Sequence, residues 1–180
     1  MAISAWLPIT ISGVSTTLAL IAFLYQVRRT RFNQSIDLLF RLENSFFGED
    51  MREQRSKAAR LMLKETPDFT EAEDVLDFFE TVALLSRKGA LDRYMIWHTF
   101  YYWIDRYYEA AKSHIEERRK TDSTVWQDIG PFVEGLRKLQ VKEAGLSTIA
   151  QTIPNSEELA RFLNEERSEG KPISRSVISR

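Results

Sequence analysis

The first feature of the chain is an uncharged stretch that ends in a cluster of arginines. No side chain from position 1 to 27 carries a charge, whereas Arg28, Arg29 and Arg31 follow within four positions. As a helix, residues 8–27 would be about 30 Å long, which matches the hydrocarbon core of a bilayer. The pattern predicts a single membrane-spanning helix.

The flanking charges predict that this helix is retained and fix its orientation. A cleavable signal carries basic residues before its apolar run, and here they come only after it. Because basic residues stay on the cytoplasmic side, we expect residues 1–27 to form an anchor with a short external N-terminus. A buried helix of a soluble protein and a cleaved signal are the competing interpretations.

Small residues in the anchor indicate possible self-association. They lie at four-residue spacing, which lets a second helix approach closely, and they are Ser12, Gly13, Thr16 and Thr17. The alternative is that the hydroxyl groups bond to carbonyls of their own helix.

Beyond the anchor, apolar positions recur every three or four residues, which is typical of amphipathic helices. We predict an all-α protein in which the anchor runs on to Gly48 and continues into a cytoplasmic bundle of about five helices. The predicted bundle spans 28–145. Residues 146–180 are assigned to a linker, a short amphipathic helix near 156–167 and a disordered tail. The remaining helices are expected at 50–64, 70–88, 92–120 and 125–141.

Local signals mark where several of these helices begin and end. Thr70 and Glu73 form a capping-box pattern, and Asp92 is placed to cap the next helix. Gly89 and Gly145 are placed to end helices. The pair at 130–131, Gly-Pro, predicts an interruption or kink in the fifth helix.

The helix at 92–120 is expected to be central because aromatic residues are concentrated in it. Eight of the 15 residues from 94 to 108 are aromatic, against 21 in the whole chain. They fall on two adjacent stripes, so two neighbours can pack on the helix at once. Its remaining side, which includes His98, Tyr102 and Asp105, is predicted to face solvent.

Composition and charge then exclude several classes of function. The 180 residues include 25 basic and 26 acidic side chains, so no overall positive field favours nucleic acid. The chain has no cysteine, which excludes disulfides and thiol chemistry. His98 and His114 would lie about 24 Å apart on one helix, too far to share a metal ion.

No motif for phosphate binding, zinc proteolysis or a nucleophile elbow occurs, so we predict no catalytic residue, cofactor or metal. One polar set remains as a candidate ligand site between the helices at 70–88 and 92–120. It consists of Asp77, Glu80, Trp103 and Arg106. Arg106 could be a structural clamp, stacking on Tyr102 or Trp103 or pairing with an acid of the helix at 70–88, or it could bind an anion.

The run DFFETVALLSRKGALDRYMIWHTFYYWIDRYYEAAKSHIEERR carries a family resemblance. It resembles a group of short bacterial membrane proteins known only as a domain of unknown function. The resemblance covers roughly 32–139 and implies one N-terminal span, a cytoplasmic helical domain and a location in the bacterial inner membrane. It implies no activity.

Three functional hypotheses follow. The first is a membrane-anchored interaction, scaffold or regulatory module with a protein partner. In this hypothesis Leu159, Phe162 and Leu163 form a docking face, although the same residues could fold back on the bundle. The second is a small-molecule or anion sensor, or an enzyme, that uses the polar set above. The third is a structural role through oligomerisation of the span.

Overall fold

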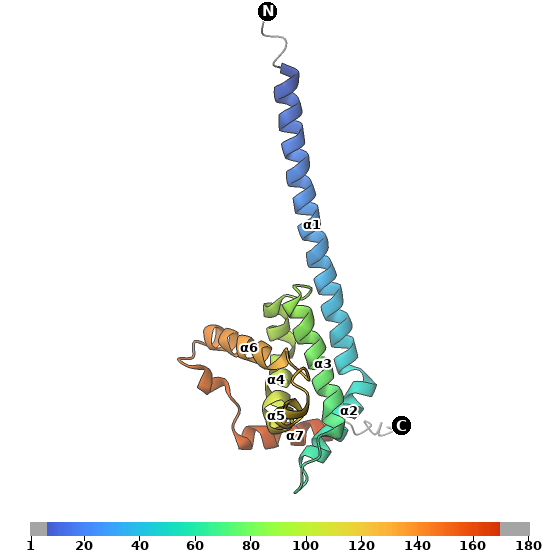
Figure 1. Ribbon diagram of the computed structural model, residues 1–180, viewed down its shortest axis with the longest axis vertical. Helices are drawn as coiled ribbons and strands as arrows, with labels where there is room; N and C mark the ends of the chain where they lie inside the picture. The colour runs from blue at the N-terminus through green and yellow to red at the C-terminus, as the bar shows by residue number, and fades with distance from the viewer. Residues whose placement is uncertain (1–6, 170–180) are drawn as a thin grey trace, which may run out of the picture.

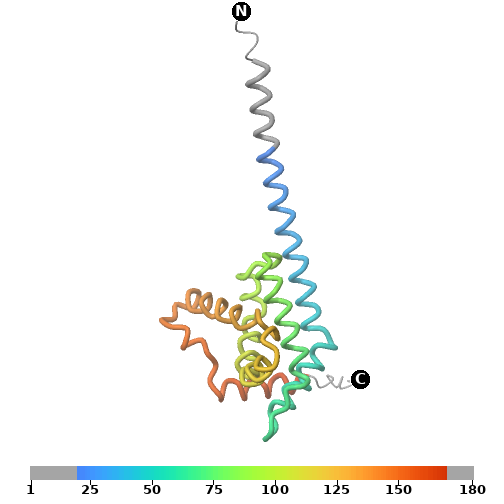
Figure 2. The backbone as a smooth tube through the Cα atoms, in the orientation of Figure 1, coloured from blue at the N-terminus to red at the C-terminus, as the bar shows by residue number. Residues whose placement is uncertain are grey.

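The computed structural model describes the backbone of residues 7–169 and the side chains of residues 20–169. In this part of the chain the fold is all-α, with seven α-helices, one short 3-10 helix and no strand (Figure 1). The class predicted from the sequence is therefore correct. One helix, α1 (Leu7–Phe47), extends far beyond the others, which gather around its C-terminal half (Figure 2).

The helices follow the predicted order with small shifts at their ends. After α1 come α2 (Glu49–Met62), α3 (Thr70–Arg87), α4 (Arg93–Ala110), α5 (Lys112–Thr121), α6 (Ile129–Ala144), the 3-10 helix η1 (Ile149–Thr152) and α7 (Ser156–Glu169). Gly145 ends α6 in the left-handed conformation at φ +66°, which glycine adopts without a Cβ clash. As predicted, Asp92 caps α4, accepting hydrogen bonds from the backbone N–H groups of Tyr94 and Met95.

Helix α1 is joined to the bundle through its last turns. Leu39 and Phe46 are buried there, and Leu42 packs against them. The ring of Phe46 has aromatic neighbours on two other helices, Phe78 at 5.2 Å on α3 and Phe100 at 5.6 Å on α4. Such edge and offset contacts add about 0.5–1.5 kcal/mol each to simple burial. The lower end of α1 is thus part of the core.

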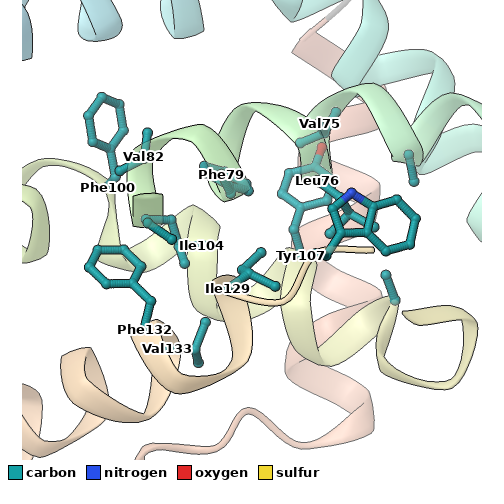
Figure 3. Packing of buried hydrophobic residues seen from close by; sticks show 14 of the residues in the cluster. Val75, Leu76, Phe79, Val82, Phe100, Ile104, Tyr107, Ile129, Phe132 and Val133 are labelled. Atoms are coloured by element: carbon teal, nitrogen blue, oxygen red, sulfur yellow. The ribbon is translucent and has the colours of Figure 1, made fainter. Parts of the chain in front are cut away.

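The rest of the core lies between α3, α4 and α6 (Figure 3). Helix α4 is central, as predicted, since it contacts α1, α3, α5, α6 and α7. Its fully buried positions fall on a single stripe that meets apolar side chains of α3 and α6. The main members of this core are Val75, Leu76, Phe79, Val82, Phe100, Ile104, Tyr107, Ile129, Phe132 and Val133.

Three local predictions are wrong. The Thr70–Glu73 capping box is absent: the start of α3 is held by the Asp68 carboxylate, which accepts from the N–H and hydroxyl of Thr70. The helix predicted at 92–120 is divided near Ala111, whose φ of −96° and ψ of 5° separate α4 from α5. Pro131 does not kink α6, because it lies in the first turn, where a missing N–H leaves no helical bond unmade.

The predicted anchor falls largely outside the described part of the chain. Residues 1–6 and the side chains up to position 19 are not described, and the small-residue set Ser12, Gly13, Thr16 and Thr17 lies among them. Where side chains are described, no helix is sufficiently long and apolar to cross a membrane. The predicted disordered tail, 170–180, also lies outside the described residues.

Candidate functional site

The structure does not bring the four predicted site residues together: Asp77 and Glu80 bond to the segment before α6, Trp103 bonds to α7, and Arg106 contacts its own helix. On α3, Asp77 accepts a hydrogen bond from Trp126 Nε1 at 2.7 Å. Glu80 accepts from the backbone N–H groups of Asp128 and Ile129 at 2.9 and 2.8 Å. Both carboxylates therefore position the segment that leads into α6.

This segment contains a strained residue that the carboxylates help to hold. Trp126 has a positive φ of 47°, which is unfavourable for a side chain of this size. Its carbonyl accepts from the guanidinium of Arg119, and its ring is buried beside His114. Glu80 acts as the cap of α6, and a negative charge there complements the helix dipole. Burial nevertheless raises the pKa of Glu80, against the opposing effect of the two N–H groups.

The other two predicted residues lie on α4 and face elsewhere. Trp103 donates from Nε1 to Glu166 of α7 at 3.2 Å. Arg106 stacks on the ring of Tyr102, with its guanidinium carbon 3.8 Å from the centroid, and donates to the Tyr102 carbonyl. The predicted stacking of Arg106 is correct, but the contact is within one helix turn and clamps no second helix.

A buried ionic junction that was not predicted as a site ties α7 to α2 and α4. The guanidinium of Arg55 is 1% exposed, and its Nη1 lies 3.1 Å from the carboxylate of Glu166. Glu166 also accepts from Tyr107 Oη at 2.9 Å and from Trp103 Nε1. Arg55 lies over the ring of Phe46, 4.4 Å from its centroid. Burial raises the pKa of the Glu166 carboxyl, and the charge of Arg55 opposes this rise.

The sequence held one signal for this junction. Arg55 lies on the apolar side of its helix, in register with Met51, Ala58, Ala59 and Met62. A lone arginine in an apolar stripe indicates a buried cation, which requires a buried anion. The partner, Glu166, could not be identified because it is 111 positions away.

Helix α7 thereby folds back on the bundle. Phe162 and Leu163 are 1% and 7% exposed, with Phe162 edge-on to Tyr107 at 5.1 Å, while Leu159 is half-buried. Of the two alternatives for these three residues, the structure shows the intramolecular one, so the face is not free to dock a partner in this state.

A second buried ion pair contradicts the predicted solvent exposure of Asp105, whereas His98 and Tyr102 on the same side of α4 are exposed as predicted. Asp105 is 1% exposed and lies 2.6 Å from Arg137 Nε of α6, and Arg137 Nη2 contacts Glu109 at 2.8 Å. Burial raises the pKa of Asp105, with Arg137 acting in the opposite direction. This pair fixes α6 against α4 and has a structural role.

The two histidines have separate environments. His114 Nε2 contacts Glu73 at 2.9 Å and its ring stacks on Phe69 at 4.9 Å, whereas His98 is exposed. Within the part of the chain with described side chains, no three metal-binding residues gather in one place. A stacking and hydrogen-bonding role accounts for His114.

Three hollows in the surface of the described residues lie along α1. A cleft of about 390 Å³ separates α1 from the turn between α3 and α4, and includes Arg31, Ser35, Gly89 and Arg93. An adjoining cleft of about 360 Å³ includes Arg31, Lys88 and Gly89. A third, shallow hollow of about 330 Å³ lies on the surface of α1 itself and is lined by Phe23, Gln26, Val27, Thr30 and Arg31. Arg31 is common to all three.

Comparison with known proteins identifies a sequence family for the chain but no activity. Residues 9–145 match the family described as Domain of unknown function (DUF4760). Comparison with curated proteins and with solved structures gives no match. The matched segment ends at Gly145, so α7, which supplies Glu166 to the buried junction with Arg55, lies beyond it. Since the match covers most of the chain, this protein belongs to the DUF4760 family.

Proposed function

We propose that this protein is a membrane-anchored interaction module whose helical bundle tethers or regulates a protein partner at the bilayer surface. Residues 1–27 provide the anchor, with the N-terminus outside and the bundle in the cytoplasm of a bacterial cell. The proposal combines the sequence pattern with the way α1 projects from the bundle (Figure 1).

The observation that carries the proposal is the apolar surface of α1 just before the arginines. Five consecutive or near-consecutive large side chains there are between 53% and 67% exposed: Leu20, Ile21, Phe23, Leu24 and Tyr25. An apolar surface of this size is unfavourable in water. It continues the uncharged N-terminal sequence, and Arg28 and Arg29 follow it directly, which supports lipid as the covering phase.

The contacts inside the bundle support a function in which its surface binds a protein partner. The four residues of the candidate ligand site all form hydrogen bonds within the protein, and the buried ions pair with one another. A protein partner is thus a better match to this domain than a substrate. A second copy, associating through the small-residue set at 12–17, is the alternative occupant.

Fractionation of the full chain tests the anchor. We expect the protein to sediment with membranes, to resist high salt and alkaline carbonate, and to be released by detergent. Leu20→Asp with Leu24→Asp should move it to the supernatant, since each acidic side chain costs up to about 3 kcal/mol in a bilayer. Phe40→Asp is the matched control, because Phe40 is 57% exposed but lies beyond the arginines. Wild-type protein in the supernatant without detergent would refute the anchor.

The absence of cysteine from the chain permits a clean test of orientation. A Ser4→Cys variant should react with a membrane-impermeant maleimide in intact cells, whereas Ser147→Cys should react only after lysis. The reverse pattern would contradict the proposed orientation. In-cell crosslinking of the tagged protein then identifies the partner, and a homodimer as the sole product would favour self-association.

A further inference from the structure

The two adjoining clefts between α1 and the α3–α4 turn share Arg31 and Gly89 and are taken together as one cleft, which combines positive charge with an apolar approach. Arg31 of α1 and Lys88 of the turn both contribute to it, and both are exposed. Among the described residues neither forms an ion pair. Arg93 lies at the edge, with its guanidinium against Gly135 of α6.

The one acidic residue in the lining of the cleft, Asp92, forms no ion pair with either cation among the described residues. The Asp92 carboxylate accepts hydrogen bonds from the N–H groups of Tyr94 and Met95 at 2.9 and 3.1 Å, so it is engaged at the start of α4. The wall opposite includes Ser35, whose buried Oγ has no hydrogen-bond partner within the described residues. The cleft therefore offers two exposed cations to an anion, with a polar serine in its lining.

On the N-terminal side of Arg31, the surface of α1 becomes apolar. The adjoining shallow hollow on the surface of α1 includes the apolar side chains of Phe23 and Val27. A ligand that fills both regions must have an anionic group next to an apolar chain. A phospholipid with a negatively charged headgroup has this arrangement, whereas a free phosphate or a nucleotide matches only the lower region.

The position of the cleft agrees with this ligand. The α3–α4 turn forms the end of the bundle that faces the N-terminal half of α1 (Figures 1 and 2). Arg31 lies four residues beyond the uncharged stretch, which is about 6 Å along a helix. In the proposed anchored state the turn is at the depth of the lipid phosphates, where each basic side chain adds about 1 kcal/mol of attraction.

We propose that Arg31 and Lys88 bind the phosphate of an anionic phospholipid while its acyl chain lies along Phe23 and Val27, so that the bundle is held against the bilayer. This inference rests on the proposed anchor. Gly89 allows the approach, because its φ of +72° turns the backbone sharply beside Lys88 and leaves no side chain in the opening.

The test is a lipid titration of the full-length protein in detergent, followed by native mass spectrometry. Phosphatidylglycerol should bind with higher affinity than phosphatidylcholine. Arg31→Gln and Lys88→Gln should each weaken phosphatidylglycerol binding about fivefold, and the double variant about 25-fold, if the charges act independently. Lys120→Gln is the control, since Lys120 lies on α5 and pairs with Glu117 at the surface. Circular dichroism confirms that each variant is folded.

The outcomes separate the inference from the anchor on which it rests. Equal binding of the two lipids, or wild-type affinity in the double variant, would overturn the lipid site while leaving the fractionation result intact. Displacement of phosphatidylglycerol by millimolar inorganic phosphate would identify free phosphate as the ligand and also overturn it. Reduced hydrogen exchange at 86–93 on adding phosphatidylglycerol, absent from the double variant, is the supporting result.

Discussion

The buried junction of Arg55 and Glu166 gives the sharpest prediction about the fold. In a Glu166→Ala variant the Arg55 cation would keep only Glu169, which is exposed and lies 3.5 Å away. Tyr107 and Trp103 would lose the carboxylate that they share. Removing one partner of a buried ion pair typically costs about 3–5 kcal/mol, because the other charge stays buried and unpaired.

That cost is comparable with what holds α7 in place. Its two well-buried apolar side chains, Phe162 and Leu163, contribute about 1.5–3 kcal/mol each, before the entropy of ordering the helix is subtracted. We therefore expect Glu166→Ala to detach α7 while the rest of the bundle stays folded. The effect should appear as local opening rather than as global unfolding.

Hydrogen exchange measured by mass spectrometry distinguishes these outcomes. Protection of residues 156–169 should fall by about 100-fold or more, with α3 and α4 unchanged. The control is Glu165→Ala, which removes only a surface bond from Tyr102 and should change protection less than about fivefold. Arg55→Met combined with Glu166→Leu should restore most of the protection, since an apolar pair removes both charges.

Two results would refute this reasoning. One is wild-type protection of α7 in Glu166→Ala, which would mean that the ion pair contributes nothing to docking. The other is an Arg55→Met/Glu166→Leu variant whose loss of protection equals the sum of the losses measured for Arg55→Met and Glu166→Leu alone, because coupled partners must show an interaction energy.

Three further predictions concern single positions. Asp92→Ala should lower the free energy of unfolding by about 1 kcal/mol in urea titrations, because two N–H groups at the start of α4 lose their acceptor; an unchanged midpoint would contradict this. Gly145→Ala should cost about 1–2 kcal/mol, because its φ of +66° places a Cβ in the left-handed region; a neutral result would show that the turn can rearrange. Glu80→Gln tests the raised pKa of Glu80. Burial raises this pKa in the folded state, so the folded protein binds the proton more tightly than the unfolded chain does. The resulting stabilisation is fully present below the pKa of the unfolded chain and is lost as pH rises through the pKa of the folded protein. Wild type should consequently gain stability over the variant as pH falls from 7 towards 5, and a constant difference in urea midpoints would contradict the raised pKa.

Helix positions were largely predictable from the sequence because they depend on local periodicity. The spacing of apolar residues and the caps at Asp92 and Gly145 act within a few positions, and each appears in the structure as expected. The Thr70 prediction failed because Asp68, two residues earlier, competes for the same groups. Pro131 was misjudged because its effect depends on which turn of the helix it occupies.

The polar contacts were less predictable because they join distant segments. Asp105 was assigned to the solvent-facing side of its helix, yet Arg137 of α6 covers it. The sequence indicates that Glu80 is a polar residue on the helix beside α4, but its partners in the structure are the backbone N–H groups of Asp128 and Ile129. Nothing in the periodicity of α3 or α4 carries information about which side chain of a third helix will reach them.

Because α1 is one continuous helix of 41 residues, the number of residues in it determines how the bundle is oriented relative to the N-terminal half of the helix. One residue inserted between the arginines and Leu38 would rotate the bundle by about 100° around the axis of α1 and shift it by about 1.5 Å along that axis. Seven inserted residues would nearly restore the original rotation, with the bundle about 10 Å further along the axis. Natural insertions in this stretch should accordingly come in multiples that preserve phase. A continuous helix can also transmit a rotation, so rotating the N-terminal half of α1 would reorient the bundle.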